Sequence, residues 1–236
     1  MIATIVNAVL VLLGSAIGIL FKSKIKEEYT NTLMSGMALC VMFIGISSVF
    51  ETSSAIHLII CMVIGILLGE LLRIEERLDG LGNFLKSKFV KSGSESSSFT
   101  EGFVGATLLF CVGSMAIMGS LEAGINHNYT IILSKSIIDA VAACTLAATL
   151  GIGVAFSAAG VLIYQGAITL LASVVAPYLS EVVVAEMTAV GGLVVVGIAL
   201  NMLGIGQNKI KVGNMLPCIF MPLVYMPLYN LITGLF

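Results

Sequence analysis

The chain has 236 residues, of which 58% are hydrophobic and only 10% are charged, and its formal net charge is −2. A water-soluble domain carries about 25% charged residues, so this composition excludes an ordinary soluble globular protein and makes lipid the expected solvent. The small net charge and the absence of a basic cluster interleaved with aromatic residues give no support to a nucleic-acid partner.

Apolar runs of spanning length follow one another along the whole chain. A membrane-spanning helix needs about 20 mostly apolar residues. Because no positive residue precedes the first run, we expect it to be a permanent span rather than a cleavable signal peptide. The sequence therefore predicts an all-α, polytopic transmembrane helical bundle, a single integral membrane domain over residues 1–236 with no soluble domain. Its eight predicted spans are 2–21, 33–50, 55–72, 100–121, 129–150, 153–176, 182–203 and 212–236.

Three features predict where these spans turn, break or bend. Between the fifth and sixth spans the chain stays uncharged for about twice the membrane thickness, so it must turn, and Gly151-Ile152-Gly153 is the expected place. In the fourth span, Gly113-Ser114 and Gly119-Ser120 allow a kink or a broken helix. In the last span, three prolines five residues apart predict a bent helix. They are Pro217, Pro222 and Pro227.

The basic residues fix the expected orientation. With the N-terminus outside, the inner segments hold all of the 11 lysines and arginines except Lys135, and the outer loops hold none. This bias follows the positive-inside rule, and it predicts a bacterial inner-membrane protein with both termini outside. The inner basic residues are Lys22, Lys24, Lys26, Arg73, Arg77, Lys86, Lys88, Lys91, Lys209 and Lys211.

One long polar stretch, residues 73–98, interrupts the apolar spans. Its first half has helical amphipathic spacing, which predicts a cytoplasmic helix lying along the inner membrane surface. The Ser- and Gly-rich residues 92–98 are typical of a flexible linker. An interfacial tether and a docking site for a partner are both compatible with this pattern.

A weak internal repeat relates the first two spans to the sixth and seventh. Gly14 matches Gly166 and Gly45 matches Gly197, both at a separation of 152 positions. The matched spans run in opposite directions across the membrane, as in the inverted repeats of many secondary transporters. Chance similarity among small-residue helices is the alternative.

Lys135 and Asp139 are the charged residues at membrane depth. They lie four positions apart in the fifth span, so they share one helical face and can pair. A charge near the bilayer centre costs at least about 2.5–3.5 kcal/mol and normally faces a protein interior or a water cavity. We expect an ion- or substrate-binding site at Asp139, with Lys135 as its counter-charge. A purely structural ion pair is the alternative.

Further polar residues at membrane depth can complete such a site. We assign Gly113 and Ser114 to it, because a broken helix frees backbone groups for binding, and Gln165 as a second ligand near the middle of the sixth span. Close packing by small residues and hydrogen bonding between helices are the alternatives. Asn7 is a weaker candidate. Glu70 and Glu186 lie close enough to the interfaces to pair there, so we leave them outside the site.

The sequence contains no motif for metal binding, disulfide formation or enzymatic catalysis. The five cysteines lie in apolar runs without a CxxC pair or a nearby histidine, which indicates packing residues rather than a metal site or disulfides. No Walker loop, GxSxG or HExxH sequence is present. We therefore expect no cofactor, no metal and no enzymatic activity.

Several blocks of the sequence resemble a known family. Residues 110–120, Lys135-Ser136-Ile137-Ile138-Asp139, Tyr164-Gln165-Gly166-Ala167 and Asn214-Met215-Leu216-Pro217 are similar to those of the YdfK/YqgA-like bacterial membrane proteins, domain of unknown function 554. The resemblance covers nearly the whole chain. It implies a bacterial inner-membrane protein, usually described as a transporter candidate, and it supplies no established substrate or functional residue.

From these patterns we expect a small secondary transporter or channel for an ion, such as H⁺ or Na⁺, or for a small solute. A non-transporting membrane scaffold or accessory subunit, which recruits a partner through residues 74–88, is the alternative. The helices rich in small residues allow a homo-oligomer without demanding one.

Overall fold

The computed structural model describes residues 1–22, 27–89, 96–206 and 208–233. Within these ranges the protein is built from α-helices and two short 3-10 helices, and no strand is present. Six helices are each long and apolar enough to cross a membrane, and two bent helix pairs make eight spans if each pair counts as one. The predicted all-α polytopic bundle is confirmed.

The helices that cross as single pieces are α1 (Ile2–Lys22), α2 (Glu27–Val49), α3 (Ala55–Leu72), α7 (Thr130–Leu150), α8 (Gly153–Leu170) and α10 (Glu181–Met202). The bent pairs are α5 (Ser96–Val112) with α6 (Ser114–Ile125), and η2–α11 (Val212–Met215 and Leu216–Phe220) with α12 (Pro222–Thr233). The remaining elements, α4 (Ile74–Phe89), α9 (Ala172–Val175) and η1 (Ala176–Tyr178), connect spans.

Both bends fall at the residues that predicted them. The fourth span bends by 62° between α5 and α6, where Gly113 is extended and accepts the first hydrogen bond of α6, from Ala116 N, at 2.9 Å. The last span bends by 42° before α12, which begins at Pro222, a residue without an N–H to continue the preceding helix. The predicted turn between α7 and α8 is also present, and Gly151 holds it with φ of 78°, a conformation that favours glycine.

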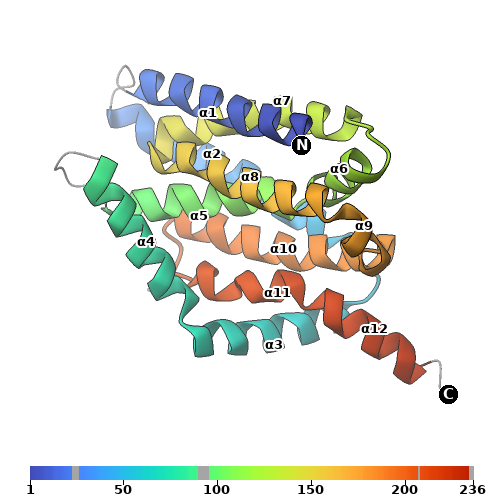
Figure 1. Ribbon diagram of the computed structural model, residues 1–236. Coiled ribbons are helices and arrows are strands. Elements are labelled where there is room, and N and C mark those ends of the chain that lie inside the picture. The colour runs from blue at the N-terminus through green and yellow to red at the C-terminus, as the bar shows by residue number, and fades with distance from the viewer. Residues whose placement is uncertain (23–26, 90–95, 207, 234–236) are drawn as a thin grey trace.

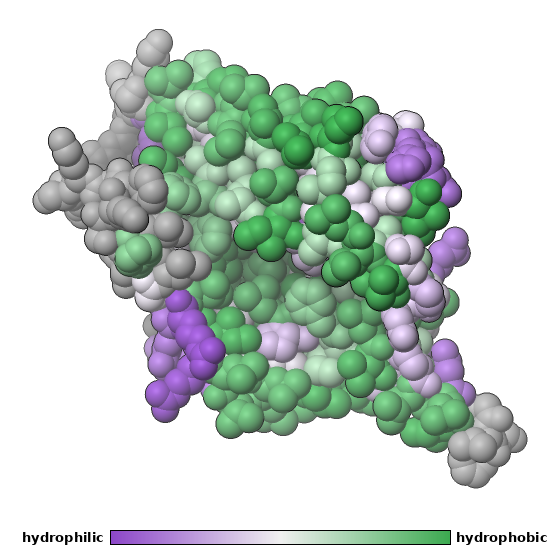
Figure 2. All heavy atoms as spheres, viewed as in Figure 1, coloured by the Kyte–Doolittle hydropathy of each residue, from purple (hydrophilic) through white to green (hydrophobic). Residues whose placement is uncertain are grey.

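Apart from Lys135, the described basic residues gather at one end of the bundle, which we call the basic end. It contains the C-terminal ends of α1, α3, α7 and α10 and the start of α5 (Figure 1). Two ion pairs join these segments, Lys209 with Glu101 at 3.1 Å and Lys211 with Glu70 at 3.5 Å. The opposite end, which we call the acidic end, carries Glu51, Glu122, Glu181 and both histidines, and a mostly hydrophobic surface lies between the two ends (Figure 2).

Close contacts between backbones hold the long helices together. A Cβ atom at Gly14 of α1 would lie 2.2 Å from the Ala140 carbonyl oxygen of α7, and one at Gly18 would lie 2.1 Å from that of Cys144. These two glycines lie four residues apart on one face of α1, which is a known motif for close helix association in membranes. The α1–α7 contact brings the start of the chain against its middle.

The helices matched by the internal repeat are neighbours in space. Helix α1 lies against α8, and α2 lies against α10. At the second contact, a Cβ atom at Gly45 would lie 2.8 Å from the Gly192 carbonyl oxygen, and the reverse distance is 2.6 Å. These contacts are consistent with two halves of the chain whose matched spans run in opposite directions across the membrane. The inverted repeat itself stays a prediction.

The polar stretch forms the amphipathic helix α4 at the basic end (Figure 1). Its first turn is bonded to the 3-10 helix η2, because the Glu75 carboxylate accepts the Gly213 N–H at 2.6 Å and the Glu75 N–H donates to Asn214 Oδ1 at 2.7 Å. Most of the predicted linker lies outside the described residues, and residues 96–98 form the first turn of α5 instead.

Candidate functional site: a buried polar cluster between α1, α7 and α8

The Lys135–Asp139 ion pair lies at the middle of the bundle. Asp139 stands halfway along the 21-residue α7, one helical turn after Lys135. The Lys135 ammonium donates to Asp139 Oδ2, and the two side chains are only 7% and 6% exposed. The spacing of four residues therefore forms the pair that the sequence predicted, in a place shielded from solvent.

Two side-chain amides from other helices complete the cluster. Asn7 of α1 donates through Nδ2 both to Asp139 Oδ2 and to Gln165 Oε1 of α8, each at 3.1 Å. Both amide side chains are fully buried. We call Asn7, Lys135, Asp139 and Gln165 the central polar cluster, and it joins three helices.

The central polar cluster is not fully satisfied. Asn7 Oδ1, an acceptor, and Gln165 Nε2, a donor, are buried and have no hydrogen-bond partner among the described residues. Leaving such a group unpaired costs about 1–3 kcal/mol, so these atoms are suited to a water molecule or a polar ligand. Next to them, the Lys135 ammonium lies 5.9 Å from the centre of the Phe110 ring, a distance that allows a cation–π contact.

Gly113 and Ser114 are not joined to this cluster. No hydrogen bond or ion pair between described residues links either of them to the central polar cluster. The Ser114 hydroxyl instead donates to the carboxylate of Glu51 in the α2–α3 loop, where burial raises the pKa of Glu51 and this hydrogen bond partly opposes the rise. The bend at Gly113 turns α6 away from the line of α5, so nearness in sequence to Phe110 does not bring Ser114 into the cluster.

A second polar cluster lies at the acidic end around Glu186, which is only 1% exposed. Its carboxylate accepts hydrogen bonds from the Thr52 hydroxyl at 2.6 Å, the Ser53 hydroxyl at 2.7 Å and the Ser53 N–H at 2.8 Å. His57 Nδ1 lies 3.4 Å from the same carboxylate, and its ring makes edge contacts with Tyr225 and Tyr229 of α12. Glu186 thus holds the α2–α3 loop against α10.

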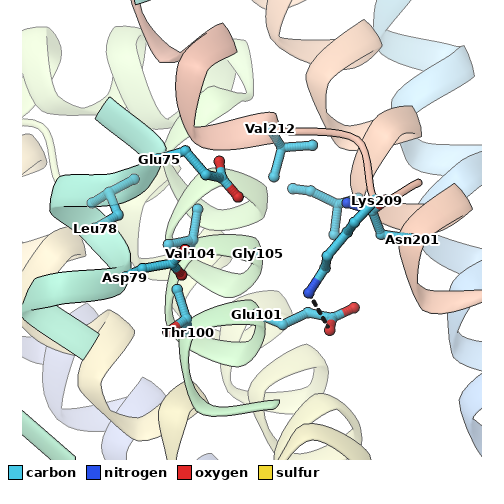
Figure 3. A pocket seen from close by; sticks show the side chains of 11 residues that line it. Glu75, Leu78, Asp79, Thr100, Glu101, Val104, Gly105, Asn201, Lys209 and Val212 are labelled. Atoms are coloured by element: carbon cyan, nitrogen blue, oxygen red, sulfur yellow. Dashed lines mark hydrogen bonds and ion pairs between the residues drawn. The ribbon is translucent and has the colours of Figure 1, made fainter. Parts of the chain in front are cut away.

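A polar cavity of about 400 Å³ opens at the basic end between α4, α5 and α10. Figure 3 shows Glu75, Asp79 and Glu101 on its wall, with Lys209 reaching across to bond Glu101. Burial raises the pKa of Glu75, although the Gly213 N–H that it accepts acts in the opposite direction. The cavity gives the basic end a pocket in which carboxylates outnumber cations.

Comparison with known proteins identifies the family. A family model described as "Protein of unknown function (DUF554)" matches residues 2–227. This chain belongs to the DUF554 family. It is 36% identical over 226 residues to the "Uncharacterized membrane protein YdfK" of Bacillus subtilis (strain 168), with 94% of each chain covered. It is 28% identical over 229 residues to the "Uncharacterized protein YqgA" of Escherichia coli (strain K12), with 96% of this chain and 95% of the relative covered.

The DUF554 assignment confirms the resemblance found in the sequence blocks and the membrane nature of the chain. No solved structure is a significant match. In this DUF554 protein the structure brings three of the five predicted site residues together, Lys135, Asp139 and Gln165. It adds Asn7, whose only signal in the sequence was an amide inside an apolar run. It also adds the cluster around Glu186, a residue that we left outside the site in the sequence analysis because it lies close to the membrane interface.

Proposed function

We propose that this DUF554 protein is a small secondary transporter for an ion or small solute, with the central polar cluster as its binding site. The observation that carries the proposal is the pair of unpartnered atoms, Asn7 Oδ1 and Gln165 Nε2, beside a buried ion pair. A purely structural ion pair is most stable when every surrounding polar group is satisfied. The free acceptor and donor instead suit a site that exchanges a polar ligand or water.

The position of the cluster supports the same proposal. It lies where α1, α7 and α8 meet, halfway along α7, and secondary transporters bind their substrates near the membrane midplane between helices. The broken fourth span runs beside these helices and supplies Phe110 next to Lys135. A helix with a built-in bend can change its angle at little energetic cost, which alternating access requires.

We assign the basic end to the cytoplasm of a bacterial cell and the acidic end to the outside of the inner membrane. Lys22, Arg73, Arg77, Lys209 and Lys211 support this assignment, because positive residues are retained on the cytoplasmic side. Both termini then lie outside. Cysteines introduced at Asn208 and at His127 should be labelled by impermeant reagents from opposite sides.

The binding site is tested with purified protein in a thermal-unfolding screen against inorganic ions, organic acids and amino acids. A ligand that binds only the folded state raises the melting temperature. We expect a ligand that stabilises the wild type and the Glu181→Gln control, whose carboxyl is exposed, but not Asp139→Asn. A ligand that stabilises all three proteins equally would remove the central polar cluster as its site. A stoichiometric partner that copurifies through α4, without ligand binding, would favour an accessory subunit.

A further inference from the structure

The unpartnered buried polar atoms in the described part of the chain lie on two neighbouring helices. Three buried side-chain nitrogen or oxygen atoms lack a partner among the described residues, and all of them lie on α1 or α8. They are Asn7 Oδ1, Ser15 Oγ and Gln165 Nε2. Helices α1 and α8 pack against each other, so we call this interface the α1–α8 seam.

Polar residues follow the α1–α8 seam through the bundle. The hydroxyls of Thr4 and Thr169 lie 3.4 Å apart toward the acidic end, and Asn7 bonds Gln165 next to them. Because the helices are antiparallel and each residue adds about 1.5 Å, Ser15 lies level with Ser157, about 12 Å from Asn7 toward the basic end. Both serines are fully buried. The seam therefore carries buried polar groups on both sides of Asp139.

The atoms around Asp139 are the wrong set for a metal cation. Hard cations in proteins take several oxygen ligands. The neighbours of Asp139 Oδ2 are instead two N–H donors, the Lys135 ammonium and the Asn7 amide. Gln165 Oε1 already accepts from Asn7, which leaves Asn7 Oδ1 as the unpartnered oxygen of the amide pair. No group of acidic, histidine or cysteine residues suited to a metal ion occurs in the described part of the chain.

A proton fits this arrangement. We infer that Asp139 is a proton-binding site and that the proton is the coupling ion of the transporter, an inference that rests on the proposed function. A hydronium ion in the seam gives its proton to the Asp139 carboxylate and leaves a water molecule. The neutral carboxyl then carries an O–H for which Asn7 Oδ1 is the available acceptor, and Lys135 loses its counter-charge. Proton binding thus removes the charge that holds Lys135 to Asp139 and rearranges the hydrogen bonds that join α7 to α1.

Few other titratable groups face this site. On α7 itself the neighbour is Lys135. From α5, the buried Cys111 thiol interacts electrostatically with both Lys135 and Asp139, and from α8, Tyr164 interacts with Cys111. Helix α1 contributes the uncharged Asn7. Asp139 is the carboxyl group of this set, so its protonation can be observed separately from the others.

Infrared difference spectroscopy of purified protein in liposomes tests the inference, because a protonated carboxyl has its own C=O stretching band. On acidification we expect one such band that is present in the wild type and in Glu186→Gln, which lacks the carboxyl of the second polar cluster, and that is lost in Asp139→Asn. Asp139→Glu should move the band without abolishing it, and this variant keeps the test valid if Asp139→Asn fails to fold. Added Na⁺ at constant pH should leave the amplitude unchanged.

Two results would overturn the inference. One is the absence of any titrating band that depends on residue 139. The other is a band whose amplitude falls as Na⁺ is added at constant pH, which would show that a metal cation competes for the carboxylate. Neither result contradicts the transport proposal. A transporter that does not bind a proton at Asp139 gives the first result, and a transporter coupled to a metal cation gives the second. If Asp139 titrates but the protein transports nothing, the proposed function is contradicted and the proton site is retained.

Discussion

Asn7 and Asp139 are separated by 132 positions in the chain, yet the Asn7 amide donates to Asp139 Oδ2 at 3.1 Å inside the bundle. This bond depends on the close contact of α1 with α7, in which Gly14 and Gly18 let the two backbones approach. The same amide nitrogen reaches Gln165 on α8. One side chain in the first span therefore fixes the relative positions of three spans at the proposed site.

Replacing Asn7 should weaken both the fold and the site. In Asn7→Ala, Asp139 and Gln165 each lose a hydrogen-bond donor, and we expect a loss of about 1–3 kcal/mol in unfolding free energy. Thermal unfolding of purified protein measures the change. Asn126→Ala, which removes an exposed amide bonded to Glu122, should leave the melting temperature within error of the wild type. An Asn7→Ala protein as stable as the Asn126→Ala control would show that the buried amide holds nothing together.

The ion pair predicts a non-additive double mutant. Lys135→Met leaves a buried carboxylate without its counter-charge, which costs about 3–5 kcal/mol. Adding Asp139→Asn removes that charge, so the double variant should regain most of the lost melting temperature. A double variant whose loss equals the sum of the two single losses would mean that the pair is not coupled.

Glu186 should act on the α2–α3 loop. In Glu186→Ala the donors of Thr52 and Ser53 lose their acceptor, and we expect the loop to become more sensitive to added protease, together with a lower melting temperature. Glu181→Ala removes an exposed carboxyl five residues earlier on the same helix and serves as the control. Equal protease sensitivity in the two variants would argue against Glu186 as the residue that holds the loop.

Glu75 gives a dependence of stability on pH. Burial raises the pKa of Glu75 in the folded protein above its ordinary value of 4.5. Between pH 4.5 and this raised pKa, the folded state therefore binds more protons than the unfolded state. Stability contributed by this group therefore falls as the pH rises through that window. Glu75→Gln can still accept the Gly213 N–H, and its melting temperature relative to the wild type should increase from acidic to neutral pH. A constant difference across the range would contradict the burial of this carboxyl.

Much of the fold follows from local features of the sequence. The number of spans follows from run length, the shared basic end follows from lysine and arginine positions, and the bends follow from Gly113 and Pro222. The Lys135–Asp139 pair was predictable for the same reason, because four positions on one helix fix a shared face without any knowledge of other helices.

The rest depends on contacts between distant segments, for which the sequence holds no local signal. Asn7 has no charged neighbour in sequence to reveal its partner, and Glu186 meets His57 only because α3 and α10 lie side by side. Among the described residues Ser114 makes no hydrogen bond to the central polar cluster, because the position of the bend at Gly113 was predictable from the sequence and its direction was not. Hydropathy gives depth in the membrane, whereas membership of a site also requires the direction in which each helix faces.

The most direct test of the transport site is the current carried by reconstituted protein on solid-supported membranes, with wild type and Asp139→Asn compared at equal insertion. Acid jumps and jumps of the ligands found by thermal unfolding supply the driving force. We predict a transient or sustained current in the wild type and in Glu181→Gln, and none above empty liposomes in Asp139→Asn. An Asp139→Asn protein that carries the wild-type current would contradict the assignment of transport to the central polar cluster.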